Sequence, residues 1–268
     1  MAGLPDSLAD FGPAALAAVV VAGYLVLGEP MVGYVLHRRF EGRLRRDGGA
    51  RRSFYRRLLV LEWGLSLLVL VIWLSSPGVG AGAVGLRWPR SWPGPLAGGL
   101  AVLLLVLVVV STRMLRSGVL LATEGAARPP VRRPGEGRHA EQEPAGHATL
   151  ALLPRTAGER RLFTLVGLTA GVCEEWLYRG FFLAVVAAVL GAPPSWVLVA
   201  VAATAFGLAH AYQGIGGILL TGMLGGVLAA LYLDTGSLLL PVLLHAVVDL
   251  RFLLVPARVL PAVGTGAR

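Results

Sequence analysis

Apolar residues run through most of this 268-residue chain in seven long segments separated by polar stretches. A helix of about 20 apolar residues, rising 1.5 Å per residue, crosses the roughly 30 Å hydrocarbon layer of a bilayer. The pattern therefore predicts an all-α, polytopic integral membrane protein with about seven transmembrane helices. We expect the spans at residues 11–36, 58–75, 96–112, 162–190, 196–211, 216–233 and 237–255.

The composition supports a chain that lies mostly in lipid. Apolar residues make up 56% of the sequence, charged residues only 15%, and the mean hydropathy is +0.72. This leaves too little polar surface to coat a water-soluble globule, so a water-soluble enzyme is excluded. The single cysteine, Cys173, excludes a disulfide framework and a cysteine-rich metal site, and we interpret it as an inert small residue.

Positive charge is concentrated in two stretches between the spans. The net charge is +9, all 24 basic residues are arginines, and residues 37–57 and 113–161 hold 18 of them. Both stretches fall on the same side of a seven-span chain, as the positive-inside rule requires of cytoplasmic loops. We expect a plasma-membrane protein with its amino terminus outside and both loops in the cytoplasm, and no nucleic-acid partner.

The second arginine-rich stretch marks the clearest boundary in the chain. Four of its prolines fall between residues 128 and 144, and the segment carries nine arginines and five glutamates, which is typical of a disordered linker. We therefore divide the chain into an accessory region of three spans (1–112), a basic proline-rich cytoplasmic linker (113–161), a distal four-helix core (162–255) and a cytoplasmic tail (256–268).

Ionisable residues inside the spans are the candidates for chemistry. A charge at bilayer depth costs at least about 2.5–3.5 kcal/mol on insertion scales, so each one needs a reason. Glu29 and Glu62, in the first three spans, fall near predicted cytoplasmic ends, and we interpret them as snorkelling residues or, near Pro30, as part of a kink. The last four spans hold six further ionisable residues, namely Glu174, Glu175, Arg179, His210, His245 and Asp249.

These six residues are predicted to share one layer of the bilayer. The rise per residue puts Glu174 and His245 both roughly 18 Å from the cytoplasmic face, and His210 roughly 8–10 Å from it. Side chains from three helices could therefore converge on one cavity that opens to the cytoplasm. Phe206 lies one helical turn from His210 and could form a wall of that cavity.

Helical spacing assigns partners within each span. Glu175 and Arg179 are four residues apart, so the two can neutralise each other on one helix face. Glu174 points about 100° away and lacks that partner, which makes it the candidate for a carboxylate that takes up and returns protons. His245 and Asp249 are also four residues apart and aim an imidazole and a carboxyl group at the same place.

Three motifs occur in order along the distal core. Residues 174–180 read EEWLYRG, residues 206–210 read FGLAH, and residues 245–249 read HAVVD. The order EExxxR, FxxxH, HxxxD resembles the CPBP family of intramembrane proteases, which contains the type II CAAX prenyl endopeptidases and bacteriocin-processing or self-immunity proteins. The resemblance spans residues 162 to about 255. The third motif of that family more often ends in Asn, whereas this chain has Asp249.

The resemblance implies an intramembrane endopeptidase, similar to CAAX-processing enzymes, whose substrate is a membrane-embedded or lipid-anchored peptide. It implies that Glu174 and His210 activate a water molecule, and that His245 and Asp249 polarise the peptide carbonyl or its oxyanion. A carboxylate cannot donate a hydrogen bond unless it is protonated, so the oxyanion role of Asp249 differs from that of an amide. Glu175 and Arg179 would support the site by holding the first helix of the core.

The cofactor and the alternatives stay open at the level of sequence. The family is called a metalloprotease group, and a glutamate-activated water without metal is also argued for it. Glu174, His210 and His245 could hold Zn²⁺ with an open position, so zinc is permitted and not required. A non-catalytic membrane scaffold or immunity protein, and a proton-coupled transporter, are the alternative functions. The sequence carries no signal for the oligomeric state or for a prenylated substrate.

Overall fold

The computed structural model describes residues 3–44, 47–118, 150 and 152–260. Within these ranges the chain is helical and contains no β-strand. The α-helices are α1 (Ala15–Leu44), α2 (Ala50–Leu74), α3 (Pro95–Ser117), α6 (Ala157–Glu175), α7 (Leu183–Leu190), α8 (Ser195–Ala209), α9 (Gly214–Thr235) and α10 (Leu239–Leu250). Short 3₁₀ helices are η1 (Leu8–Ala14), η3 (Ala211–Gln213), η4 (Arg251–Leu254) and η5 (Ala257–Val259).

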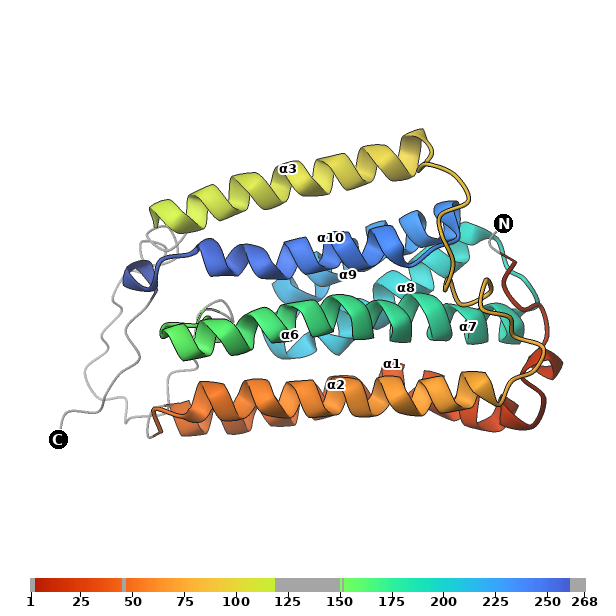
Figure 1. Cartoon of the computed structure of the whole chain (residues 1–268), viewed down its shortest axis with the longest axis horizontal. Coiled ribbons are helices and arrows are strands. Elements are labelled where there is room, and N and C mark those ends of the chain that lie inside the picture. Colours follow the sequence, from red (N-terminus) through yellow and green to blue (C-terminus); the bar gives the residue numbers. More distant parts are fainter. Residues whose placement is uncertain (1–2, 45–46, 119–149, 151, 261–268) are drawn as a thin grey trace, which may run out of the picture.

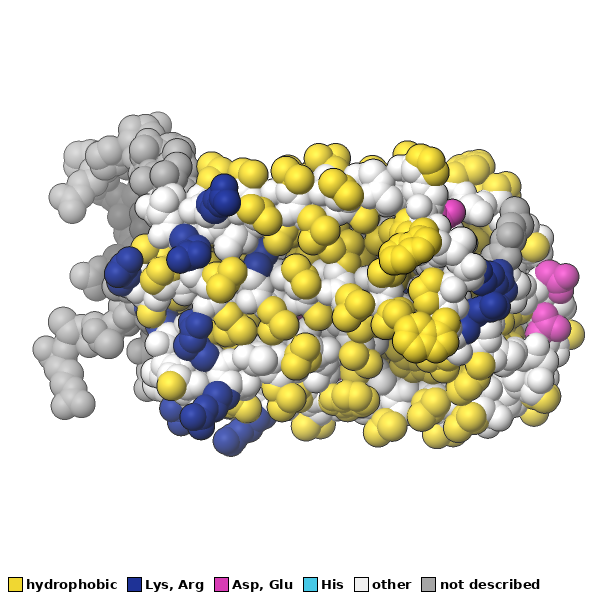
Figure 2. All heavy atoms as spheres, turned by 45° about the horizontal axis from the view of Figure 1, so that its top comes forward, with side chains coloured by type: hydrophobic (Ala, Val, Ile, Leu, Met, Phe, Trp, Pro, Cys, Tyr) yellow, Lys and Arg dark blue, Asp and Glu magenta, His cyan; other side chains and the backbone are white. Residues whose placement is uncertain are grey.

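The helices form an elongated bundle (Figure 1). Four helical stretches of the described chain are long and apolar enough to cross a membrane, namely Leu8–Leu44, Ala50–Leu74, Pro95–Ser117 and Ala211–Thr235. Large apolar side chains such as Leu16, Leu27 and Leu96 are more than 70% exposed, which suits contact with lipid. Figure 2 shows this apolar surface between an end rich in arginine and an opposite end that carries acidic side chains and a smaller basic group. The predicted all-α, polytopic membrane fold is confirmed.

One prediction about the helix ends is wrong. The stretch 37–57, expected as a loop, is mostly helical, because α1 continues to Leu44 and α2 already begins at Ala50. Arginine is a good helix former, and side-chain pairs one turn apart support this segment, such as Arg43 with Asp47 at 2.6 Å. The helices therefore extend beyond the apolar segments that the hydropathy pattern detects.

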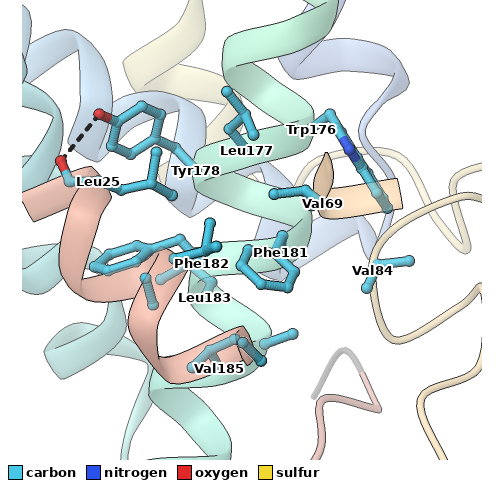
Figure 3. Close-up of a cluster of buried hydrophobic side chains, with 14 of the residues drawn as sticks. Leu25, Val69, Val84, Trp176, Leu177, Tyr178, Phe181, Phe182, Leu183 and Val185 are labelled. Atoms are coloured by element: carbon cyan, nitrogen blue, oxygen red, sulfur yellow. Dashed lines mark hydrogen bonds between the residues drawn. The ribbon is translucent and has the colours of Figure 1, made fainter. Parts of the chain in front are cut away.

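The largest core joins the proximal helices to the distal ones. Leu25 of α1 and Val69 of α2 are fully buried in this core (Figure 3). Their neighbours there include Phe181 and Leu183, from the segment that directly follows α6. The helix α3 packs mainly on α9 in a separate cluster that includes Ala97 and Leu228. The division into an accessory region and a distal core thus stays a prediction, and α1 and α2 share the apolar core of the distal helices.

The fourth predicted span is one helical path with a change of helix type. A π-helix, η2 (Trp176–Phe182), joins α6 to α7, and all seven of its residues are buried. The expected break is not present, because the helical path continues through a local widening, and the expected tilt stays a prediction. π-helical turns are rare in proteins overall, and those that do occur are often found at functional sites. Here the widened turn begins directly after the two glutamates of the first motif.

Glycines bring α8 and α9 into close contact. A methyl group added to Gly207 of α8 would lie 2.6 Å from the backbone oxygen of Ile218 on α9. Gly222, which faces the same crossing, leaves only 3.1 Å to the backbone oxygen of Ala203. Gly207 and Gly222 therefore serve packing within the molecule, and this close approach places the end of α8 beside the core. Most of the predicted linker, at 119–149, and the end of the tail, at 261–268, lie outside the described residues.

Candidate active site

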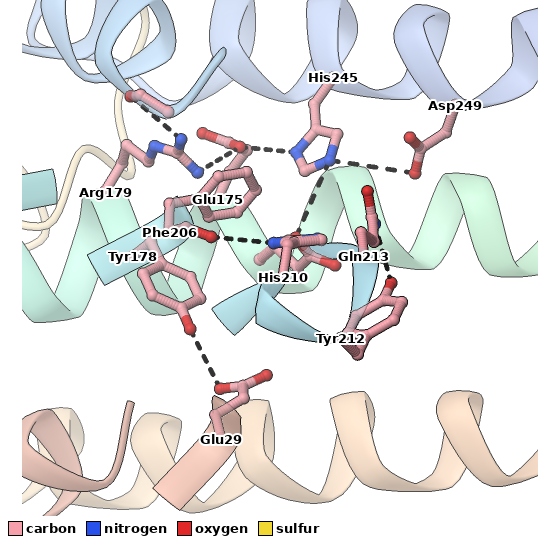
Figure 4. Close-up of polar contacts among 12 residues, drawn as sticks. Glu29, Glu175, Tyr178, Arg179, Phe206, His210, Tyr212, Gln213, His245 and Asp249 are labelled. Atoms are coloured by element: carbon pink, nitrogen blue, oxygen red, sulfur yellow. Dashed lines mark hydrogen bonds and ion pairs between the residues drawn. The ribbon is translucent and has the colours of Figure 1, made fainter. Parts of the chain in front are cut away.

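The six ionisable residues of the distal spans come from three helical segments (Figure 4). Glu174 and Glu175 end α6, and Arg179 lies in η2. His210 follows the last residue of α8, and His245 and Asp249 lie on α10.

Glu175 is the hub of the buried polar contacts. Its Oε1 accepts a hydrogen bond from Arg179 Nη1 at 2.7 Å, so the ion pair expected from the helical spacing is present. The same oxygen lies 2.7 Å from Nδ1 of His245, a contact that the sequence did not suggest. The side chains of Glu175 and Arg179 are both 0% exposed. One carboxylate therefore links the first and third motifs in a region without solvent.

Arg179 is held from two further sides. Its Nη2 donates to the backbone oxygen of Gly225 at 3.2 Å, and its guanidinium carbon lies 4.3 Å from the centre of the Phe206 ring. These contacts orient the cation that neutralises Glu175. A rigid cation also fixes the carboxylate, and the carboxylate in turn fixes the imidazole of His245.

The contact with Glu175 decides what His245 presents to the site. Because a carboxylate that pairs with arginine accepts hydrogen bonds, Nδ1 of His245 carries the proton between them. Nε2 then points away, and it lies 3.9 Å from Oε2 of Glu174 and 3.9 Å from Oδ2 of Asp249. These distances are too long for direct hydrogen bonds but suit polar groups that share a small molecule between them.

The exposure of these side chains to solvent increases from His245 through Glu174 to Asp249. The side chain of His245 is 4% exposed, that of Glu174 is 18% exposed, and that of Asp249 is 31% exposed. The site is therefore open on the Asp249 side and closed at Glu175. Oε2 of Glu174 is buried and makes no hydrogen bond with the described part of the chain. Oε2 of Glu175 also lacks a hydrogen-bond partner in the described chain, but Oε1 of Glu175 is bound by both Arg179 and His245. Glu174 is therefore the glutamate of the two that accepts no hydrogen bond from the described residues.

His210 reaches the same region through Phe206. Its Nδ1 lies 2.9 Å from the backbone oxygen of Phe206, so Nδ1 donates and Nε2 of the neutral ring stays free. The Phe206 ring lies 4.9 Å from the His210 ring and stands edge-on to the His245 ring at 5.8 Å. Phe206 therefore lies against both imidazoles, and its role as a wall of a cavity stays a prediction.

The sequence analysis missed a contact between the proximal helices and this site. Tyr178, inside the first motif, donates its hydroxyl hydrogen to Oε2 of Glu29 at 3.2 Å. Glu29 lies 15 residues before the end of α1 and Glu62 lies 12 residues after the start of α2, so each is about 20 Å from that helix end. Glu29 therefore has a partner inside the molecule, and Oε2 of Glu62 is buried. The expected position of both glutamates near the cytoplasmic ends of their spans stays a prediction. A tyrosine within a glutamate motif was the available signal for a buried polar partner.

The arrangement does not present a preformed metal site. In the described ranges, no three His, Cys, Asp or Glu side chains are grouped closely enough to hold a metal ion. Nδ1 of each histidine is engaged, by Glu175 or by a backbone oxygen, and only the two Nε2 atoms remain as ring donors. We assign no catalytic step to a metal, and zinc binding by Glu174, His210 and His245 stays an untested hypothesis.

The comparison with known families agrees with the motifs and their geometry. Residues 157–251 match the family model described as type II CAAX prenyl endopeptidase Rce1-like. This distal part of the chain is similar to that family, and we refer to residues 157–251 as the Rce1-like domain. It contains all three motifs, and the family supports an intramembrane endopeptidase of the CAAX-protease type as the general activity. No curated protein and no solved structure matches the chain.

The contribution of the buried pair of Glu175 and Arg179 to stability can be tested by substitution. We expect Arg179→Ala to lower the free energy of unfolding by about 3–5 kcal/mol, because Glu175 is left as a buried charge without its cation. Thermal unfolding in detergent measures the loss. The double variant Glu175→Gln with Arg179→Met removes both charges and keeps an acceptor for His245, so it should regain much of the stability. A double variant no more stable than Arg179→Ala would show that the pairing is not what stabilises the site.

Proposed function

We propose that the Rce1-like domain hydrolyses a peptide bond of a membrane-embedded or lipid-anchored substrate with a water molecule activated by Glu174. The observation that carries this proposal is the unequal environment of the two adjacent glutamates. Oε1 of Glu175 is bound by both Arg179 and His245, whereas Glu174 accepts no hydrogen bond from the described chain and its Oε2 lies 3.9 Å from Nε2 of His245. A free carboxylate opposite an oriented imidazole is suited to general acid–base catalysis.

The proposed reaction moves one proton at each step. Glu174, with Nε2 of His210 as a second acceptor, takes a proton from water while the water oxygen attacks the carbonyl carbon of the peptide. Nε2–H of a protonated His245, whose positive charge Glu175 stabilises, donates to the developing oxyanion. Glu174 then returns its proton to the leaving amine nitrogen, and the carbon–nitrogen bond breaks. All atoms come from water, the peptide and these side chains.

Access to the site favours a substrate that approaches along the membrane. Asp249 is the more exposed carboxylate, and it lies one helical turn closer than His245 to the end of α10 at η4. A peptide tethered to the bilayer would bring its scissile bond to this side without leaving the membrane. We therefore propose a membrane-associated peptide as the substrate class.

The decisive variant is Glu174→Gln, which keeps the side-chain shape and removes the base. We expect it to lower hydrolysis at least about 100-fold, within the range for a general base. The assay uses purified protein in liposomes with prenylated and unprenylated membrane-anchored reporter peptides, each with and without a zinc chelator. The matched control is Glu62→Gln, which changes an intramembrane glutamate whose Oε2 also lacks a hydrogen-bond partner. Equal losses in the two variants would contradict the assignment of Glu174.

Asp249 gives a second test of the same site. An amide at this position keeps the acceptor and adds a donor, so Asp249→Asn should retain at least the activity of the unmodified chain, while Asp249→Leu should lose about tenfold or more. Initial rates of reporter cleavage at saturating substrate measure the difference. Similar losses in the two variants would mean that hydrogen bonding by this side chain does not contribute to catalysis.

We also propose that the arginine-rich end of the bundle faces the cytoplasm, in the plasma membrane, as the positive-inside rule favours. Gly48 lies at that end and Gly80 in the connection between α2 and α3 at the other, and a methyl group added at either meets no atom within 4 Å. In intact cells, Gly80→Cys should react with an impermeant thiol reagent and Gly48→Cys should not. The native Cys173 is buried and gives little background. Labelling of Gly48→Cys from outside would reverse the proposed topology.

A further inference from the structure

A groove outside the proposed catalytic site runs between α1 and α2 at the arginine-rich end of the bundle. Its volume is about 680 Å³, within the range of about 300–1,000 Å³ that is usual for ligand pockets. It is lined chiefly by Leu36 of α1 and by Arg52, Arg56, Arg57, Val60 and Leu61 of α2.

The positive charge of this groove lacks a counter-charge in the described structure. Arg52 and Arg56 are one helical turn apart on the same face, all three arginines are exposed, and no acidic residue lines the groove. The acidic side chains of this end are engaged elsewhere: Glu41 with His37 at 3.3 Å, Asp47 with Arg43 at 2.6 Å, and Glu159 with Arg51 at 3.7 Å.

The floor of the groove is apolar and continues toward the middle of the bundle. Val60 lies four residues beyond Arg56 on α2, about 6 Å farther along the helix axis. The side chain of Val60 is 72% exposed and that of Leu61 is 44% exposed. Arginine residues of α2 therefore line the outer part of the groove, and uncovered aliphatic side chains line the part nearer the middle of the bundle. A soluble anion would contact only the arginines and would leave the aliphatic side chains uncovered.

We infer that this groove is a binding site for an anionic glycerophospholipid. Arg52, Arg56 and Arg57 bind the phosphate and the anionic head group, and one acyl chain lies against Leu36, Val60 and Leu61. Basic pockets between transmembrane helices bind anionic lipid head groups in this way. The inference uses no residue of the proposed catalytic site and stands apart from the proposed function.

The test compares lipid affinities in detergent at one fixed salt concentration. The probes are dioleoyl phosphatidylglycerol and dioleoyl phosphatidylcholine, and native mass spectrometry measures each dissociation constant. We expect Arg52→Gln with Arg56→Gln to weaken phosphatidylglycerol binding roughly 20- to 30-fold and to leave phosphatidylcholine binding unchanged within about twofold. Arg57→Gln alone, a milder change, should weaken phosphatidylglycerol binding about fivefold.

The matched control removes two arginines from the same end of the bundle outside the groove. Arg113→Gln with Arg116→Gln, both exposed near the end of α3, should change phosphatidylglycerol affinity less than threefold. Equal weakening in the two double variants would reduce the effect to general surface charge and overturn the site. Unchanged affinity in the groove variants, or binding of glycerol phosphate as strong as that of the whole lipid, would overturn it as well.

Discussion

The buried carboxylate of Glu175 is the interaction on which the rest of the site depends. One of its oxygens accepts from Arg179 and from His245, at 2.7 Å in each case, in a region from which solvent is excluded. A charge buried in this way is tolerated only when it is paired and hydrogen-bonded. Glu175 therefore joins His245 of α10 to Arg179 in the widened helix turn after α6. The bond to Nδ1 also turns Nε2 of His245 toward Glu174 and Asp249.

The position of the site inside the bundle follows from packing around this pair. Phe206 covers the Arg179 guanidinium on one side and contacts both histidines, so a single ring joins the second motif to the first and third. Close contact between Gly207 and α9 brings the end of α8 to the place where this is possible. The contact of Tyr178 with Glu29 adds α1 to the same polar group. The Rce1-like domain therefore has its polar centre supported by a helix outside residues 157–251.

Much of this protein follows from its sequence alone. The lengths of the apolar segments are set by the thickness of a bilayer, so they determine an all-helical membrane fold. The spacing of Glu175 and Arg179 determines their pairing, because residues four apart share one helix face. The order of the three motifs determines the family to which the distal part of the chain is similar. These features depend on one segment, or on a linear order, and need no knowledge of neighbouring helices.

The tertiary structure alone decided which residues meet between helices. Periodicity predicts the face on which His245 lies, but the partner of Nδ1 is Glu175, 70 residues away, and packing of α10 on α6 selects it. Hydropathy likewise placed Glu29 near the cytoplasmic end of an apolar segment, and only the packing of α1 against η2 shows that it accepts a hydrogen bond from Tyr178. The groove between α1 and α2 arises in the same way. Contacts between segments depend on how side chains fill the space between helices, and that information is not carried by any one helix.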